Sequence, residues 1–284
     1  MNRSLRHKVF VTKQIPQSGR GLLPDGSTRM WSPITSTLIM GRDDAVLVDP
    51  PLTTAQAAEI GDWIAASRRR LRQIYVTHGH GDHWFGAIPL LQRFPGVAVR
   101  ATDGTAKVMQ AQNDPDFRAE FWDRVFPGQL PAGEVDVSVV DEQGFDLDGA
   151  ALLPIEVGHT DTDATTMLHV PVMGLLVAGD VVYNGVHLYL TESGGVNGID
   201  EWLAALDTAE SLNPATVVAG HKAPGAFDNP SQIDATRRYL TDSRRLLQSS
   251  ESAEAFYEAM LLRHPNRVNP GALWGAAITL FPPA

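Results

Sequence analysis

Three histidines and one aspartate fall within six consecutive residues, 78–83, where an apolar strand at 74–76 meets an expected helix at 84–94. Packing such polar groups together is costly unless a positive charge organises them. Imidazole and carboxylate bind metal ions, so a metal site is the favoured interpretation and a solvent-exposed polar turn is the alternative. Gly79 and Gly81 alternate with the ligand-type residues and let the backbone turn tightly.

Three further residues of ligand type share one local setting, a preceding glycine at the carboxyl end of an apolar strand. They are His159, Asp180 and His221, which follow the strands expected at 151–157, 175–178 and 216–219. A single histidine in such a place is more often structural. Several turns of the same kind in one chain, however, favour one shared metal site.

The composition of the chain limits which residue types can bind a metal ion and which partners the protein can have. The chain contains no cysteine, so a metal site has to be built from His, Asp and Glu. The formal net charge of −10 argues against a nucleic-acid partner, because that affinity comes largely from Lys and Arg on phosphates. We see no secretory signal and no apolar stretch long enough for a membrane span. The expected protein is cytoplasmic and acts on a small molecule without nucleic-acid or membrane partners; a homodimer is compatible with these features.

The rest of the chain alternates between strands and helices in two blocks. Further strands are expected at 8–13, 35–40, 45–49, 97–101, 135–140 and 165–170, and further helices at 104–112, 116–126, 199–212 and 231–262. Thr53 or Thr54 can cap one more helix, whose apolar residues recur at helical spacing. Two such blocks predict two sheets packed face to face with helices outside. The loop at 14–33 is long, and such loops are usually functional or disordered.

The order of these motifs resembles the metallo-β-lactamase superfamily: His-x-His-x-Asp-His at 78–83, then Gly-His-Thr, Gly-Asp and Gly-His. The resemblance extends over about residues 35–223. It implies an α+β fold, an αββα sandwich of two mixed β-sheets flanked by helices, with the site at one edge of the sheets. We expect a single domain over 1–284, with a core at about 35–228 and C-terminal helices at about 229–264.

The resemblance also implies a dinuclear ligand set. The first ion would be bound by His78, His80 and His159, the second by Asp82, His83 and His221, and Asp180 would bridge both. Asp49 matches an early aspartate of the family that supports the ligand loop. The expected cofactors are two divalent metal ions. Zinc is favoured by the His and Asp ligands, and manganese, iron or cobalt would fit similar sites.

The activity that the resemblance implies is hydrolysis by a hydroxide that bridges the two ions, because a bound cation lowers the pKa of water to near 7. The expected substrate is a small ester, with a lactone favoured. Asp82 and Tyr183 are the candidate catalytic residues. Asp82 would orient the hydroxide, and Tyr183 lies three residues after Asp180, the offset of a tyrosine in acyl-homoserine lactone lactonases. A packed loop aromatic is the alternative for Tyr183.

Other activities stay open, since a fold does not select a substrate. A thioester or β-lactam hydrolase would use the same site. A mononuclear iron persulfide dioxygenase would keep most of the ligands, and a non-catalytic binding module is a further class. The residues 161–164, Asp-Thr-Asp-Ala, depart from the Pro-Gly that many lactonases and glyoxalase II-like thioesterases have after Gly-His-Thr.

Several other residues are candidates for the lining of a pocket. Met30, Trp31 and the aromatics at 117–122 could form an apolar wall, although core packing is the alternative for most of them. His187, Tyr189 and Lys222 lie close in sequence to predicted ligands. The remaining histidines, His7, His169 and His264, are expected to be structural.

Overall fold

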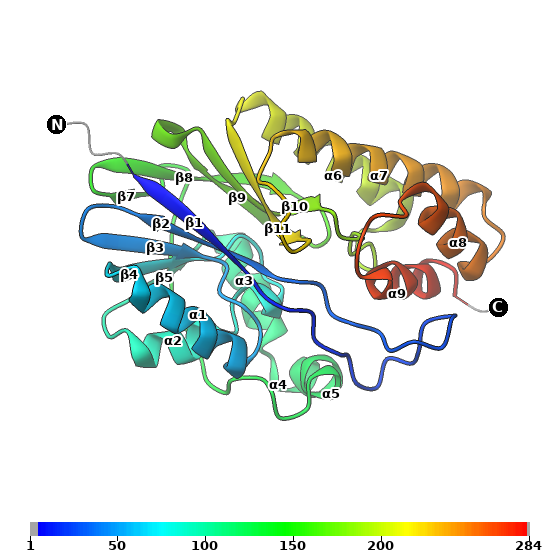
Figure 1. Cartoon of the computed structure of the whole chain (residues 1–284), viewed down its shortest axis with the longest axis horizontal. Coiled ribbons are helices and arrows are strands. Elements are labelled where there is room, and N and C mark those ends of the chain that lie inside the picture. Colours follow the sequence, from blue (N-terminus) through cyan, green and yellow to red (C-terminus); the bar gives the residue numbers. More distant parts are fainter. Residues whose placement is uncertain (1–4, 283–284) are drawn as a thin grey trace.

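A six-stranded sheet forms the first half of the computed structural model, which describes residues 5–282 (Figure 1). Its strands, in spatial order, are β1 (Arg6–Val11), β2 (Thr35–Met40), β3 (Asp44–Val48), β4 (Arg70–Tyr75), β5 (Ala98–Ala101) and β6 (Val137–Val139). The first three strands pair antiparallel, and β3 to β6 pair parallel. The carboxyl ends of β3 and β4 therefore meet at one edge of this sheet.

A five-stranded sheet packs against the first. Its strands, in spatial order, are β11 (Thr216–Lys222), β10 (Leu175–Asn184), β9 (Thr165–Val170), β8 (Ala150–Gly158) and β7 (Phe145–Leu147). Only β10 and β11 pair parallel within it. Buried apolar side chains from both sheets, among them Val46, Tyr75, Leu168 and Val218, form one core between them. Both sheets are mixed, as the sequence predicts.

Helices cover the outer faces and complete the αββα sandwich (Figure 1). The first sheet is covered by α1 (Thr54–Ala66), α2 (Ala87–Arg93) and α3 (Asp103–Gln112), and the second by α6 (Gly195–Ser211) and α7 (Ser231–Ser249). Thr53 caps α1, because its hydroxyl accepts from Gln56 N while the Gln56 side chain accepts from Thr53 N. The single helix expected at 116–126 is replaced by three short pieces: α4 (Pro115–Phe117), a π-helical segment η2 (Arg118–Trp122) and α5 (Asp123–Val125).

The C-terminal part contains two helices that the sequence pattern does not separate or predict. The helix expected at 231–262 is interrupted after Ser249, and Ser252 caps α8 (Ala253–Arg263) by accepting from Ala255 N. The following helix, α9 (Pro270–Leu280), is not predicted, since its proline and glycines are typical of loops. The proline lies in the first turn, where its missing N–H costs no hydrogen bond. Within residues 5–282, no helix combines the length and apolar character needed to cross a membrane.

Two strands continue further than their apolar runs indicate. The strands expected at 175–178 and 216–219 extend to Asn184 in β10 and to Lys222 in β11. Their pairing is irregular at Gly179, which has φ of 51° and no room for a Cβ atom, because Thr77 Oγ1 would lie 2.5 Å away. Asp180 and His221 consequently lie inside strands rather than after them. Their backbone is held by the sheet.

Candidate metal centre

The loop that follows β4 carries the first group of ligand-type residues, and Asp49 orients it. Asp49 accepts hydrogen bonds from Thr77 N and Thr77 Oγ1, both at 2.8 Å. Its Oδ2 atom also lies 3.4 Å from His83 Nδ1. Gly79 and Gly81 pack so tightly that an added Cβ atom would lie 2.4 Å and 2.5 Å, respectively, from neighbouring side chains. Asp49 therefore supports the loop as the resemblance implies.

One group of predicted ligands collects around Asp180, which β10 contributes. His83 Nε2 lies 3.3 Å from Asp180 Oδ1, and His221 Nε2 lies 3.3 Å from Asp180 Oδ2. Asp82 Oδ2 lies 3.4 Å from His221 Nε2 and 3.8 Å from His83 Nε2. All four side chains are buried. Predicted ligands from the loop after β4, from β10 and from β11 thus meet at one place.

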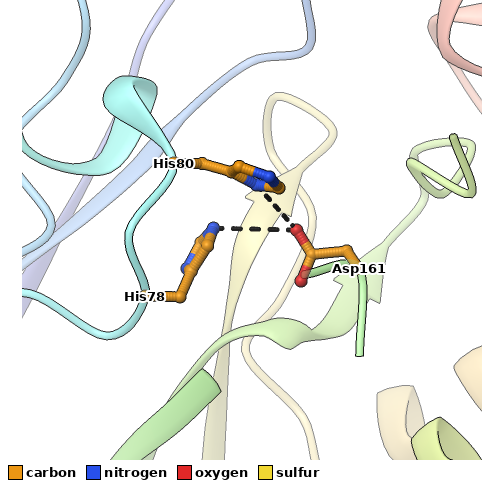
Figure 2. Close-up of side chains that lie close together, drawn as sticks. All are labelled: His78, His80 and Asp161. Carbon is orange, nitrogen blue, oxygen red and sulfur yellow. Dashed lines mark ion pairs between the residues drawn. The ribbon is translucent and has the colours of Figure 1, made fainter. Parts of the chain in front are cut away.

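A second group joins His78 and His80 to Asp161, whose carboxylate points toward both imidazoles (Figure 2). Asp161 Oδ2 lies 3.7 Å from His78 Nε2 and 3.0 Å from His80 Nδ1, and all three residues are buried. The other carboxylate oxygen of Asp161 accepts from Thr160 Oγ1 at 2.9 Å. His78 also belongs to a set with His83 and Asp180 whose ligand atoms lie within 4.8 Å of one another. The two groups are therefore contiguous.

The structure does not bring His159 into either group, in contrast to the expectation for the first ion. Its Nδ1 atom lies 2.7 Å from Asp163 Oδ1, and its side chain is 17% exposed. Its ring lies beside the first turn of α6, near Gly198. Gly158 has a left-handed backbone with φ of 78°, and the turn after it places Asp161, rather than His159, beside His78 and His80. His159 Nε2 is buried and has no hydrogen-bond partner among the described residues. The Asp-Thr-Asp sequence at 161–163 is the feature that could have indicated this exchange.

The two groups have the properties that a divalent cation requires. His78 Nε2 and Asp180 Oδ1 are buried and have no hydrogen-bond partner, which is costly unless a cation satisfies them. Burial lowers the pKa of His78, so its imidazole is neutral and able to bind a metal. Burial by itself would raise the pKa of Asp82, but the imidazoles of His83 and His221 outweigh burial and hold that pKa below its ordinary value. These residues fit a bound metal.

Tyr183, a candidate catalytic residue, contacts a predicted ligand directly. It lies within β10, and its hydroxyl donates a hydrogen bond to Asp180 Oδ2. The side chain is completely buried beneath the pocket that the ligands line. Burial and the carboxylate of Asp180 raise the pKa of Tyr183 well above its ordinary value, so the phenol stays protonated. Tyr183 is therefore a strand residue that is bonded to Asp180 and packed in the core, with its ring 6.0 Å from that of Trp202.

A pocket lies over both groups and has one apolar side. This side, which we name the aromatic wall, consists of Trp31, Phe117, Phe121 and Trp122. Trp31 Nε1 donates to Asp82 Oδ2 at 2.8 Å, and the rings of Trp31 and Trp122 pack edge-on with centroids 5.6 Å apart. Trp31 and the aromatics at 117–122 thus line the pocket, whereas Met30 does not. Trp122 also belongs to the core of the first sheet, and Trp31 and Phe121 pack against it, as the core-packing alternative expects.

The segment between β1 and β2, residues 12–34, brings Trp31 to this position, and we name it the N-terminal loop. It extends beyond the sheets toward α9 (Figure 1). Its last part is bonded to a predicted ligand, because His221 Nδ1 donates to Pro33 O at 2.8 Å. Ile34 also forms a β-bridge with His221. The loop is thus attached to the metal centre at its base.

Glu192 is a pocket residue that the sequence analysis did not identify. Its Oε2 atom lies 3.2 Å from His80 Nε2, and its Oε1 atom accepts from Tyr189 Oη at 2.9 Å. Both Glu192 and Tyr189 line the pocket, so the expectation for Tyr189 is confirmed. Glu192 lies between β10 and α6 and is not part of any metal-binding motif. No local pattern could therefore have identified it.

Two other candidates for the pocket lining have partners elsewhere. Lys222 is buried and forms an ion pair with Asp228, with Nζ and Oδ1 2.6 Å apart. His187 is buried as well, and its Nδ1 atom lies 3.0 Å from Tyr239 Oη. Neither residue lines the pocket over the two ligand groups. Lys222 thus connects β11 to the loop that follows it, and His187 contacts α7.

Known proteins provide an independent comparison. The family model of the metallo-beta-lactamase superfamily matches residues 29–221. A metallo-beta-lactamase family protein from Thermus thermophilus has a TM-score of 0.64 and 18% identity, covering 96% of this chain and 91% of that one. A metallo-beta-lactamase from Pontibacter korlensis has a TM-score of 0.57 and 20% identity, with coverages of 83% and 100%.

The enzyme FIM-1 from Pseudomonas aeruginosa, a metallo-beta-lactamase solved in a mono-zinc form, has a TM-score of 0.53 and 15% identity, covering 84% of this chain and 92% of that one. A search of curated protein sequences found no significant match. At these identities the solved structures establish the αββα fold alone. The family model, however, covers more than half of the sequence and includes the motifs whose side chains form the two buried ligand groups. The chain therefore belongs to the metallo-beta-lactamase superfamily.

Proposed function

We propose that the protein is a metal-dependent hydrolase of a small, largely apolar ester, with a lactone as the favoured substrate. The observation that carries this proposal is that both buried ligand groups border a single pocket whose side is the aromatic wall. Such a pocket suits a substrate whose carbonyl group reaches the metal centre while its acyl or ring part lies against the aromatic side chains.

Two divalent metal ions, zinc first, are the proposed cofactors. Asp82, His83 and His221 would hold one ion and His78 and His80 with Asp161 the other, while Asp180 borders both groups. Divalent ions at such a centre lower the pKa of coordinated water and polarise a carbonyl oxygen. Manganese, iron and cobalt remain alternatives, since ligands of this kind do not select zinc alone.

Two side chains of the pocket have proposed roles in the reaction. Asp82 orients the attacking water, and the hydrogen bond from Trp31 Nε1 holds Asp82 Oδ2 in place for this task. Tyr183 donates to Asp180 Oδ2 and so fixes the direction of the other Asp180 oxygen. In this proposal Tyr183 acts as a positioning residue. It reaches the substrate carbonyl only if its hydroxyl leaves Asp180.

One observation favours a second candidate, an iron-dependent oxygen-using enzyme. His78, His80 and Asp161 are two histidines and one carboxylate, a ligand set that is typical of mononuclear non-haem iron(II) sites. The complete set of Asp82, His83 and His221 beside it, however, is not needed for a mononuclear enzyme. The hydrolase is therefore the first candidate. Metal content and oxygen consumption separate the two.

Proton release in a weakly buffered indicator solution tests the hydrolase. The zinc-loaded protein is compared on a series of lactones and on acyl-glutathione thioesters, with Asp82→Ala protein as the blank. Lactone turnover that is lost in the blank is the expected result. Turnover of thioesters but not of lactones would contradict the lactone substrate and indicate a thioester hydrolase.

The metal content of the purified protein is measured in parallel. Two equivalents of zinc are expected for each chain. One equivalent of iron, together with oxygen consumption and no proton release from any ester, would contradict the hydrolase and support the second candidate.

A further inference from the structure

Two arginines line the same pocket as the predicted metal ligands, and both belong to the N-terminal loop. Arg29 is buried, with 3% of its surface exposed. Its Nη1 atom donates to Arg20 O at 2.9 Å, and its Nη2 atom donates to Gly271 O at 3.1 Å. The two residues are thus neighbours. Arg29 connects the loop to α9.

The structure provides neither arginine with a counter-charge. Within residues 5–282, neither guanidinium forms an ion pair with a carboxylate, and the Nε atoms of both are buried without a hydrogen-bond partner. Burial and the charge of Arg20 lower the pKa of Arg29 to about 10, so Arg29 is still a cation at neutral pH. Two neighbouring cations with desolvated N–H groups are unfavourable until an anion satisfies them. This lack of a carboxylate partner within the described residues contrasts with the net charge of −10 of the chain.

The surroundings of the two arginines differ, and the difference suggests separate tasks. Gly275 of α9 leaves space for Arg29, since a Cβ atom at that position would lie 2.4 Å from Arg29 Nη2. Arg29 is therefore fixed between the loop and the helix. Arg20 is only half-buried, and its guanidinium lies over the ring of Phe121, 5.1 Å from the centroid. Arg20 is therefore partly accessible at the edge of the aromatic wall.

We infer that Arg20 and Arg29 form a binding site for an anionic oxygen group of the substrate, and that the substrate is an ester with an apolar body and a carboxylate away from the scissile bond. This inference rests on the proposed function. Guanidinium groups bind carboxylates through two parallel hydrogen bonds, which gives direction as well as affinity. The aromatic wall is contacted by Arg20 at Phe121 and by Asp82 at Trp31, and in this inference it would pack against the apolar body. The arginines thereby determine which end of the substrate reaches the metal centre.

A pair of esters of matched length tests this inference. The zinc-loaded protein is assayed with 4-nitrophenyl hydrogen succinate, which carries a free carboxylate, and with neutral 4-nitrophenyl butyrate. The variant is Arg20→Gln, because Arg20 lies on a half-buried loop and its loss should leave the fold intact. We expect KM for the succinate ester to rise at least about tenfold, with kcat little changed, because a hydrogen bond to a charged group is lost. KM for the butyrate ester should stay unchanged.

Arg124→Gln is the matched control. Arg124 is exposed and donates to Gly19 O at 3.4 Å, next to Arg20 in sequence, but it does not line the pocket. Removal of its charge should leave KM unchanged for both esters. Equal changes in KM for the two esters in Arg20→Gln, or the same selective change in Arg124→Gln, would overturn the inference.

Calorimetric titration keeps the inference testable even if the wild-type protein hydrolyses neither ester. Succinate and inorganic phosphate are titrated separately into the purified wild-type protein and into Arg20→Gln. Succinate binding that weakens at least about tenfold in the variant supports the arginine site independently of hydrolysis. Stronger binding of phosphate than of succinate would show that the arginines prefer a phosphate group, and would overturn the inference that the substrate carries a carboxylate. Absence of binding to the wild type, or binding unaffected by the substitution, would exclude the site.

Discussion

The metal centre and the walls of the pocket are built in different ways. Asp180 and His221 stand on paired strands, and the other ligands stand in tight turns directly after strands. The walls come from the N-terminal loop, from the short helical pieces at 115–125 and from α9. A sheet holds its residues more rigidly than a loop does, and binding residues are often on loops that a rigid scaffold positions. Substitutions in the two regions should therefore separate the chemical step from substrate selection.

The strongest test of the metal centre is Asp180→Ala. Asp180 lies between His83 and His221, so its loss removes a ligand and leaves charged neighbours without a partner. We expect kcat/KM to fall at least about a thousandfold, since a metal centre stabilises transition-state charge by several kcal/mol. Circular dichroism should show that the sheets are intact. Activity within about tenfold of the wild type in a well-folded variant would contradict the proposed centre.

The next largest predicted effect is on zinc affinity, and it tests which of Asp161 and His159 is a metal ligand. Asp161→Ala should reduce zinc affinity about a hundredfold or more, a loss at least as large as that of an outer partner of a metal ligand. His159→Ala should change affinity much less, because His159 contacts Asp163 and not the two ligand groups. Zinc affinity is measured by competition with a chelator of known affinity. The opposite order would restore His159 as a ligand and contradict the observed turn.

A substitution of Trp31 tests how the pocket wall affects the metal centre, because Trp31 belongs to the aromatic wall and donates a hydrogen bond to Asp82. Trp31→Phe keeps an aromatic ring but removes the N–H that donates to Asp82 Oδ2. We expect kcat to fall about tenfold, the effect of one hydrogen bond to a charged acceptor. Trp122→Phe is the control, since Trp122 donates to Gln112 and not to a predicted ligand. Equal losses of kcat in both variants would indicate that packing alone explains the effect.

The smallest predicted effect concerns stability where the C-terminal segments attach to the scaffold. His187 N donates to Val268 O, and its ring packs against Tyr239, with Nδ1 3.0 Å from Tyr239 Oη. Burial, helped by the charge of Arg267, lowers the pKa of His187 to about 3. The unfolded chain therefore binds this proton more readily. The contribution of His187 to stability is complete above its ordinary pKa of 6.5 and decreases as the pH falls from 6.5 toward 3.

Urea denaturation at about pH 7.5 and about pH 5.5 measures this effect. The wild type should lose on the order of 1 kcal/mol more stability than His187→Asn between these pH values, because one unit of pKa corresponds to about 1.4 kcal/mol. All other titratable groups are common to both proteins, so their contributions cancel in the comparison. Identical pH dependence in the two proteins would show that His187 is not held neutral.

The sequence predicts best the features that depend on neighbouring residues. The spacing within 78–83 identifies most of the ligands, and apolar runs place the strands that carry them. Asp161 is not predicted, although the Asp-Thr-Asp sequence at 161–163 is a signal for it, because its position beside His78 and His80 follows a turn with a left-handed backbone at Gly158. Arg29 could not be predicted either, since its partner Gly271 lies 242 positions away on a helix whose sequence looks like a loop. Local patterns reveal the chemistry, whereas the substrate pocket depends on distant contacts.

The hydrogen bond from His221 Nδ1 to Pro33 O has a consequence for how new specificities can arise. The acceptor is a backbone carbonyl and not a side chain, so this contact does not depend on the identity of a side chain. The part of the N-terminal loop that carries both arginines can then change in sequence, while Trp31 and Pro33 keep their contacts with Asp82 and His221. In laboratory evolution, libraries confined to residues 14–30 should alter the substrate range while leaving the contacts of Trp31 and Pro33 with the predicted ligands in place.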